Sequence, residues 1–224
     1  MKKYAIIVAG GEGNRAGGSI PKQFQLINGI PMLWWSVRAF YAENHDTEII
    51  IVMHPGFFDD WDILHSELPQ SDKEISVKVV CGGRTRCESV SSGLNSIDMS
   101  EAALVAIHDA ARPLIEEELI SRGWRAAEEY KAAVPVVPVT DSLRKIDGNK
   151  NWTVPRKDYV KVQTPQVFDA ALIKSAYSAV DTAELTDDGS VAEAYGKKLF
   201  LFEGSTRNMK VTNPEDFKIA SVLM

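Results

Sequence analysis

Short apolar runs alternate with longer segments of helical periodicity from the N-terminus to Pro138. Runs such as 49–52, with the sequence Ile-Ile-Ile-Val, are apolar at every position, which is typical of parallel strands covered by helices on both faces. We predict strands at residues 4–9, 48–53, 77–80, 103–107 and 133–137, and helices at about 32–43, 56–68, 88–95 and 116–129. This order predicts an α/β fold, a three-layer sandwich with a mainly parallel sheet.

The alternation stops after Pro138. A polar turn at 147–151 separates two β-prone stretches, 142–146 and 152–154, so we predict a β-arm at about 139–162 that projects from the sheet. Arms of this kind often contact a second subunit, and a surface hairpin without a partner fits the composition equally well. Helices at 170–179 and 188–195, a strand at 198–202 and a helix from Pro214 complete the pattern.

Composition supports one folded domain over residues 1–224. Hydrophobic residues make up 45% of the chain, and 25 Lys and Arg oppose 31 Asp and Glu for a net charge of −6. This acidic balance argues against nucleic-acid binding, because phosphate-backbone affinity needs clustered cations. The apolar runs are far shorter than the roughly 18 to 20 residues of a membrane span, and no secretory signal begins the chain. We therefore expect a cytoplasmic protein without a membrane partner.

A glycine-rich stretch, GGEGNRAGG at 10–18, follows the first predicted strand. Glycines at this place let backbone N–H groups approach phosphate oxygens. The stretch resembles a dinucleotide fingerprint, but the glycines at its end and Pro21 interrupt the helix that this fingerprint needs, and the ending of a Walker loop is absent. We interpret it as a phosphate-binding loop in which Arg15 and Lys22 cover a polyphosphate. Two solvated surface cations are the structural alternative.

A carboxylate follows the strand predicted at 103–107. Ligands in open α/β sheets sit beyond the carboxyl ends of the strands, so Asp109 lies where a metal-bridged phosphate would bind. A helix cap or turn is the alternative role for Asp109. Arg112 precedes a proline and is available to an anion.

A second glycine turn, CGGRTRCES at 81–89, follows the strand predicted at 77–80. Its backbone can contact the edge of a base, with Arg86 and Ser89 fixing the turn or a ribose hydroxyl. Exposed charges at Arg84 and Arg86 are an equally good interpretation. Hydrolytic chemistry is disfavoured, because the four histidines lack zinc-ligand spacing and no G-x-S-x-G motif is present.

Near the C-terminal end, Thr186 opens a stretch, 186–190, that reads as an N-capped helix start as easily as a site. Lys210, in the sequence NMKVT at 208–212, has no such structural explanation.

These segments, taken in order, resemble one family, the 2-C-methyl-D-erythritol 4-phosphate cytidylyltransferases. The ordered set spans nearly the whole chain and is more specific than any of its motifs. The motifs are GGEGNR at 10–15, PKQ at 21–23, GG-x-x-R-x-x-SV at 82–90, HDAARP at 108–113, PVTDS at 138–142, QTPQ at 163–166, TDD at 186–188 and N-x-KVT at 208–212.

The resemblance implies a Rossmann-like nucleotidyltransferase fold, a homodimer joined through the β-arm, Mg²⁺, and the non-mevalonate isoprenoid pathway. It implies that CTP and a sugar-alcohol phosphate are the substrates. By position, it assigns catalytic roles to Arg15, Lys22 and Lys210, nucleotide contacts to Ala9, Gly10, Gly11, Gly13, Gly83, Arg86, Ser89 and Asp109, the metal to Asp109, and acceptor contacts to Arg112, Ser142, Arg156 and Thr186. Ser142 and Arg156 would reach the acceptor from the partner subunit.

In the implied reaction the acceptor phosphate, already anionic, attacks the α-phosphorus of CTP in line and expels pyrophosphate. Cations and Mg²⁺ relieve the repulsion between the two anions, so no histidine base is needed. Two alternatives remain open. The loop sequence Val-Ala-Gly-Gly at 8–11 and Ala16 resemble the related D-ribitol-5-phosphate cytidylyltransferases, although Ala110-Ala111 and Arg156 favour the methylerythritol family. A non-catalytic nucleotide-binding module is disfavoured by the presence of both Lys22 and Asp109.

Overall fold

A computed structural model describes residues 1–11 and 21–224 of the chain. Arg15 and Gly13, two of the predicted site residues, lie outside the described residues.

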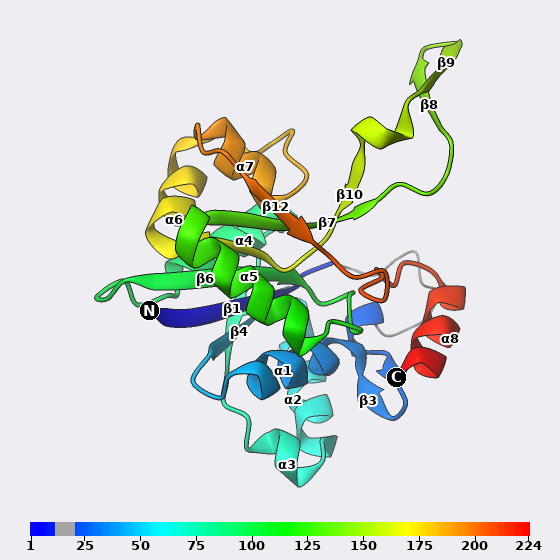
Figure 1. The fold of residues 1–224 in the computed structure, drawn as a ribbon. Coiled ribbons are helices and arrows are strands. Elements are labelled where there is room, and N and C mark those ends of the chain that lie inside the picture. Colours follow the sequence, from blue (N-terminus) through cyan, green and yellow to red (C-terminus); the bar gives the residue numbers. More distant parts are fainter. Residues whose placement is uncertain (12–20) are drawn as a thin grey trace.

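An eight-stranded mixed sheet forms the centre of the fold, in the order β10-β7-β11-β6-β1-β4-β5 with β12 beside β7 (Figure 1). The pairs β6-β1, β1-β4, β4-β5 and β7-β12 are parallel. β10 and β11 run antiparallel to their neighbours. The strands are β1 (Lys2–Ala9), β4 (Glu48–Met53), β5 (Val77–Cys81), β6 (Ala103–Asp109), β7 (Ala132–Pro138), β10 (Val160–Val162), β11 (Gln166–Asp169) and β12 (Phe200–Glu203). The predicted α/β sheet with parallel core strands is confirmed.

Helices cover both faces of the sheet. On one face, α1 (Met32–Glu43), α2 (Phe58–Glu67) and α5 (Glu117–Tyr130) join the core around Ile7 through Trp34, Trp61 and Trp124 respectively. On the other face, α4 (Arg86–Asn95), α6 (Ala170–Ala179) and α7 (Asp188–Ala194) pack against Ile6. Because successive side chains of a strand point to opposite faces, the apolar part of β1, residues 4–9, supplies both cores. The three layers are those expected from the sequence.

The sequence pattern did not predict four short strands and one short helix. They are β2 (Leu26–Ile27), β3 (Ile30–Pro31), β10, β11 and α3 (Gln70–Lys73). β11 inserts antiparallel between β6 and β7, so these two strands do not pair directly. The helix expected at 56–68 begins with a 3₁₀ turn at Pro55–Phe57, where the ring nitrogen of His54 accepts from the N–H of Gly56.

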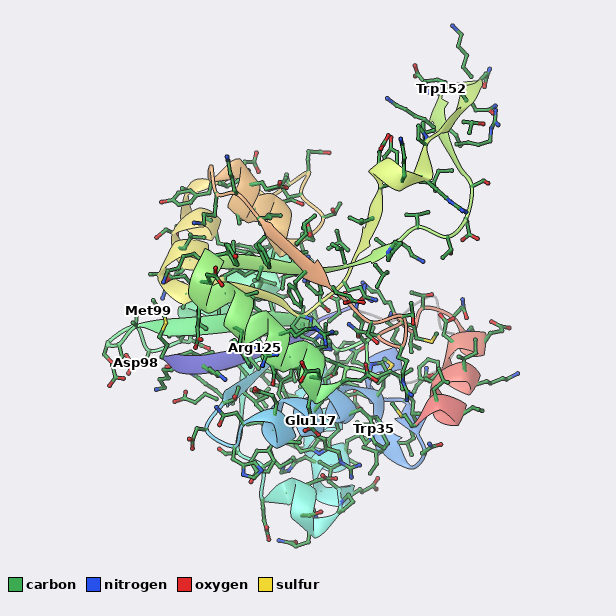
Figure 2. The ribbon with its side chains drawn as sticks, in the orientation of Figure 1. Trp35, Asp98, Met99, Glu117, Arg125 and Trp152 are labelled. Atoms are coloured by element: carbon green, nitrogen blue, oxygen red, sulfur yellow. The ribbon has the colours of Figure 1, made fainter. Side chains whose placement is uncertain are left out.

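The predicted arm is a separate hairpin of β8 (Leu143–Asp147) and β9 (Lys150–Val154), with Asp147 opposite Lys150. It stands away from the sheet beyond β7 and β10 (Figure 1). Trp152 lies near its tip (Figure 2). Apolar side chains on the arm face solvent, with Ile146 74% and Trp152 43% exposed.

The C-terminal helix α8 (Pro214–Leu223) begins with a capping box formed by Asn213 and Asp216. It packs with Val211 and Leu114 in a small third core. The N–H of Val211 donates to the carbonyl of Ala111 at 2.8 Å, so the segment before α8 is fixed against the turn that follows β6. No helix in the described ranges is long and apolar enough to cross a membrane.

Candidate active site

The carboxyl ends of β1, β4, β5 and β6 open into one pocket of about 370 Å³. This is the edge of a parallel sheet where ligands are expected. Its lining residues are Val8, Gly10, Gly11, Lys22, His54, Gly83, Arg84, Thr85, Arg86, Ser89, Asp109, Ala111 and Lys210. The structure therefore brings together eight of the predicted site residues from five separate motifs.

The glycine turn after β5 forms one wall of this pocket. The hydroxyl of Ser89 accepts from the N–H of Gly83 at 3.2 Å and donates to the carbonyl of Thr85 at 2.9 Å. A Cβ on Gly83 would lie 2.3 Å from the Cβ of Glu88, a distance that no side chain tolerates. Ser89 is buried and therefore fixes the turn, while the backbone of Gly83 borders the pocket.

The end of β1 is fixed from behind by Gln23. Its side-chain amide donates to the carbonyls of Ala9 at 2.8 Å and Gly11 at 3.0 Å. Ala9 is buried and is not among the pocket-lining residues, whereas Gly10 and Gly11 are. Lys22 lines the pocket, and its ammonium donates to the carbonyl of Val211 at 3.2 Å.

Asp109 lies among three cations. Its Oδ2 accepts from Lys210 Nζ at 2.7 Å, its Oδ1 accepts from Arg86 Nε at 3.1 Å, and Arg112 Nε lies 4.0 Å from Oδ2. Burial alone would raise the pKa of Asp109, but the charges of Arg86 and Lys210 outweigh it and hold the pKa well below its usual range. Asp109 is therefore ionised at neutral pH.

Arg86 is not the free exposed charge that the sequence allowed. Its Nη1 and Nη2 donate to the two carboxylate oxygens of Asp188 at 2.9 and 2.7 Å. The hydroxyl of Tyr177 donates to Asp188 Oδ1 at 2.6 Å. Burial would lower the pKa of Arg86, but the charges of Asp188 and Asp109 raise it. Sequence reasoning gave neither Asp188 nor Tyr177 a role in the site.

A second pocket of about 480 Å³ adjoins the first and shares three lining residues with it, Arg86, Asp109 and Lys210. The predicted acceptor residues Arg112 and Thr186 line only this second pocket. Arg112 is held in place because its Nη1 donates to the carbonyl of Asn208 at 2.8 Å. The N-cap interpretation of 186–190 is also satisfied, by Asp187, which accepts from the N–H of Ser190.

Ser142 and Arg156 line neither pocket. Both are exposed on the β-arm segment, where Arg156 Nη1 donates to the carbonyl of Thr140. Their predicted contribution to a partner's site stays a prediction.

His54 is a pocket residue that the sequence analysis did not select. It directly follows β4, and this position at the carboxyl end of a parallel strand is the signal by which the sequence analysis could have selected it. Its Nδ1 accepts from the N–H of Gly56 at 3.1 Å, which places the ring proton on Nε2 in the neutral side chain.

Comparison with known proteins decides the family. The family model described as IspD, 2-C-methyl-D-erythritol 4-phosphate cytidylyltransferase, matches residues 4–224. The chain belongs to this family. The curated cytidylyltransferases of this description from Phocaeicola vulgatus and Bacteroides fragilis are 40% and 41% identical to it, over the full length of both chains.

Solved structures of the family have the same fold. The crystal structure of 2-C-methyl-D-erythritol 4-phosphate cytidylyltransferase from Thermus thermophilus aligns with a TM-score of 0.77 and 31% identity, covering 97% of this chain and 96% of that one. The Francisella tularensis enzyme aligns with a TM-score of 0.80 and 27% identity over the whole of both chains. The chain is thus a nucleotidyltransferase of the non-mevalonate isoprenoid pathway with CTP as a substrate.

Proposed function

We propose that the chain transfers the cytidylyl group of CTP to the phosphate of 2-C-methyl-D-erythritol 4-phosphate at the junction of its two pockets. The products are 4-diphosphocytidyl-2-C-methyl-D-erythritol and pyrophosphate. One observation carries the proposal: Arg86, Asp109 and Lys210 line both pockets, so a nucleotide in one and an acceptor in the other meet beside them. Full-length relatives of about 40% identity support the choice of acceptor.

CTP belongs in the first pocket. The backbone of the glycine turn at Gly83 offers polar groups to the base or ribose, and Lys22 and Lys210 line the same pocket within reach of the phosphates. The acceptor belongs in the second pocket, where Arg112 is the cation that faces an anionic group. The side chain of Arg112 is only 12% exposed and donates to the carbonyl of Asn208, which suits a site that must orient a phosphate.

The chemistry needs charge compensation more than proton transfer. The acceptor phosphate attacks the α-phosphorus in line, the bond to the β-phosphate oxygen breaks, and pyrophosphate leaves with that electron pair. The side chain of Lys210 is 44% exposed, and its ammonium donates one hydrogen bond to Asp109. The ammonium can therefore also donate to an incoming phosphate oxygen. His108 is no general base here, since it is wholly buried and bonded to Thr164 and the carbonyl of Arg112.

The residues present fit a magnesium ion shared with the nucleotide. Mg²⁺ is usually held by one or two carboxylates together with substrate phosphates, and Asp109 is an ionised carboxylate at the pocket junction. Within the described residues no cluster of three or more His, Cys, Asp or Glu forms a cage for a metal. Asp109 would hold the ion, which when bound neutralises phosphate charge.

The β-arm supports a homodimer. Its strands pair only with each other among the described residues, and Ile146 and Trp152 leave apolar surface exposed on it. Apolar arms that stand away from their own subunit are suited to covering another one. In this arrangement Ser142 and Arg156 complete the acceptor pocket of the partner.

The test is pyrophosphate release by the purified protein with CTP and Mg²⁺, in the presence of 2-C-methyl-D-erythritol 4-phosphate, D-ribitol 5-phosphate or no acceptor. Release only with methylerythritol phosphate is the expected result. Release only with ribitol phosphate would keep the chemistry and overturn the acceptor. Binding of CTP without release in any mixture would overturn the transferase assignment in favour of a nucleotide-binding module.

A further inference from the structure

A line of four side chains runs from the core to the junction of the two pockets. Tyr177 on α6 donates its hydroxyl to Asp188 at 2.6 Å, and Asp188 accepts both Nη groups of Arg86 at 2.9 and 2.7 Å. Arg86 in turn donates its Nε to Asp109 at 3.1 Å. Neither Tyr177 nor Asp188 lines either pocket. Their hydrogen bonds connect them to the pocket junction through Arg86.

The geometry of this line fixes the guanidinium in one orientation. Two parallel N–H···O bonds to a single carboxylate set both the position and the plane of an arginine side chain. Asp188 is fully buried, and its Oδ1 is held a second time by Tyr177, so the carboxylate that orients Arg86 is itself fixed. Arg86 is left with its Nε directed at Asp109.

The charges explain why a second carboxylate is useful behind Arg86. Without Asp188, the full charge of Arg86 would face Asp109 and any substrate phosphate. With Asp188 present, its buried carboxylate largely neutralises the charge of Arg86 on the side away from the pockets, and the Arg86 side chain is only 25% exposed. Lys210 is more exposed, and among the described residues its ammonium pairs with Asp109, so it is the cation that can exchange this partner for a phosphate.

We propose that Asp188 and Tyr177 are positioning residues, which hold Arg86 so that it orients the carboxylate of Asp109 at the point of transfer. Arg86 then acts on the reaction through Asp109 and does not bind a phosphate as its main partner. The inference rests on the proposed function, because it assigns these residues to the transfer step at the same junction.

Two adjacent acidic residues at the start of α7 have different tasks in this account. Asp187 caps the helix and accepts from the amide of Gln166 at 2.7 Å, while Asp188 faces inward to Arg86. The side chain of Asp187 already caps the N-terminus of α7, so the helix start does not need a second carboxylate at position 188. The inward carboxylate is therefore explained by Arg86 and not by the helix.

The test is a double-mutant cycle on turnover with Asp188→Asn, Arg86→Gln and the two combined. If Asp188 acts only through Arg86, each single variant lowers kcat about tenfold or more, KM for CTP changes less than about threefold, and the double variant is no slower than Arg86→Gln. Asp169→Asn is the matched control, since Asp169 caps α6 and contacts neither Arg86 nor the pockets. It should leave kcat unchanged.

Removing one member of a buried pair can unfold a protein, so a milder variant is included. Tyr177→Phe removes a single hydrogen bond without changing charge and should lower kcat by about twofold to fivefold in the parent but have no effect in the Arg86→Gln background. Additive losses of Tyr177→Phe and Arg86→Gln, or a parent-like kcat for Asp188→Asn, would overturn the inference alone. A parent that releases no pyrophosphate with any acceptor would overturn the proposed function itself.

Discussion

Lys210 Nζ lies 2.7 Å from the carboxylate of Asp109, although 101 positions separate the two residues in the sequence. The contact depends on the segment before α8, where the N–H of Val211 is bonded to the carbonyl of Ala111. Folding therefore places a flexible cation beside the ionised carboxylate at the junction of the two pockets.

Replacing Lys210 tests the cation at the junction. In the proposed reaction Lys210 stabilises charge on the transferring phosphoryl oxygens, so Lys210→Ala should lower kcat by about 10² to 10³, by analogy with the loss of one oxyanion donor. Steady-state turnover measures the change. Lys218→Ala is the matched control, because Lys218 is exposed on α8 and lines neither pocket. Equal turnover in Lys210→Ala and Lys218→Ala would remove Lys210 from the reaction.

Gly83 should tolerate no side chain. The Cβ introduced by Gly83→Ala would meet the Cβ of Glu88 at 2.3 Å, so the turn must shift and with it the backbone that borders the nucleotide pocket. We expect KM for CTP to rise about tenfold or more while KM for the acceptor changes little. A variant that affects the acceptor more than CTP would place the nucleotide elsewhere.

Mixing two inactive variants tests the partner contribution of Arg156. In a mixed dimer of Arg156→Ala and Lys210→Ala subunits, one of the two sites regains both residues if Arg156 acts across the interface. Random mixing should then restore about a quarter of the parent activity, because half of the dimers are mixed. The two variants are measured alone and after joint refolding. No gain on mixing, with dimers confirmed by light scattering, would show that Arg156 does not act in trans.

His108 makes stability depend on pH. Burial lowers the pKa of this imidazole from 6.5 to about 4, against the opposing charge of Asp109. Between these two values the unfolded chain binds a proton that the folded chain does not, so stability present at neutral pH is lost as the pH falls through this window. The loss should be about 2 kcal/mol between pH 7 and pH 5.

NMR titration of the His108 ring measures this pKa directly, and denaturant unfolding at the two pH values measures the stability. A ring that titrates near 6.5 would contradict the account. Asp109 adds little between pH 7 and pH 5, because its carboxyl is ionised in both the folded and the unfolded chain there.

The elements that the sequence predicted well are long and uniformly patterned. β4 and α1 have the predicted bounds, since a fully apolar run and a twelve-residue amphipathic helix leave little ambiguity. The strands β10 and β11 were not predicted because each is too short to show an alternation of apolar and polar residues. The position of β11 depends on its pairing with β6 and β7, which are distant in the sequence. The single-domain organisation over 1–224 stays a prediction.

Motifs at strand ends predicted most of the pocket, because the carboxyl ends of parallel strands meet at one edge. Asp109 at the end of β6 and Gly83 after β5 both line the pocket. Lys210 lines it too, but it follows no strand directly and was assigned through the family resemblance. Asp188 was not recognised because its partner Arg86 lies 102 positions away and its neighbour Asp187 already explained the local pattern as a cap. Ala9 was placed at the nucleotide by its motif, but it is buried and serves as an acceptor for Gln23.

The stereochemical course at the α-phosphorus tests the central claim, that the acceptor phosphate attacks CTP directly between Lys210 and Asp109. The measurement uses CTP with a chiral α-phosphorothioate and 2-C-methyl-D-erythritol 4-phosphate, followed by determination of the configuration of the diphosphate product. One in-line displacement predicts inversion at phosphorus. Retention would require two displacements through a cytidylylated protein side chain and would contradict the account.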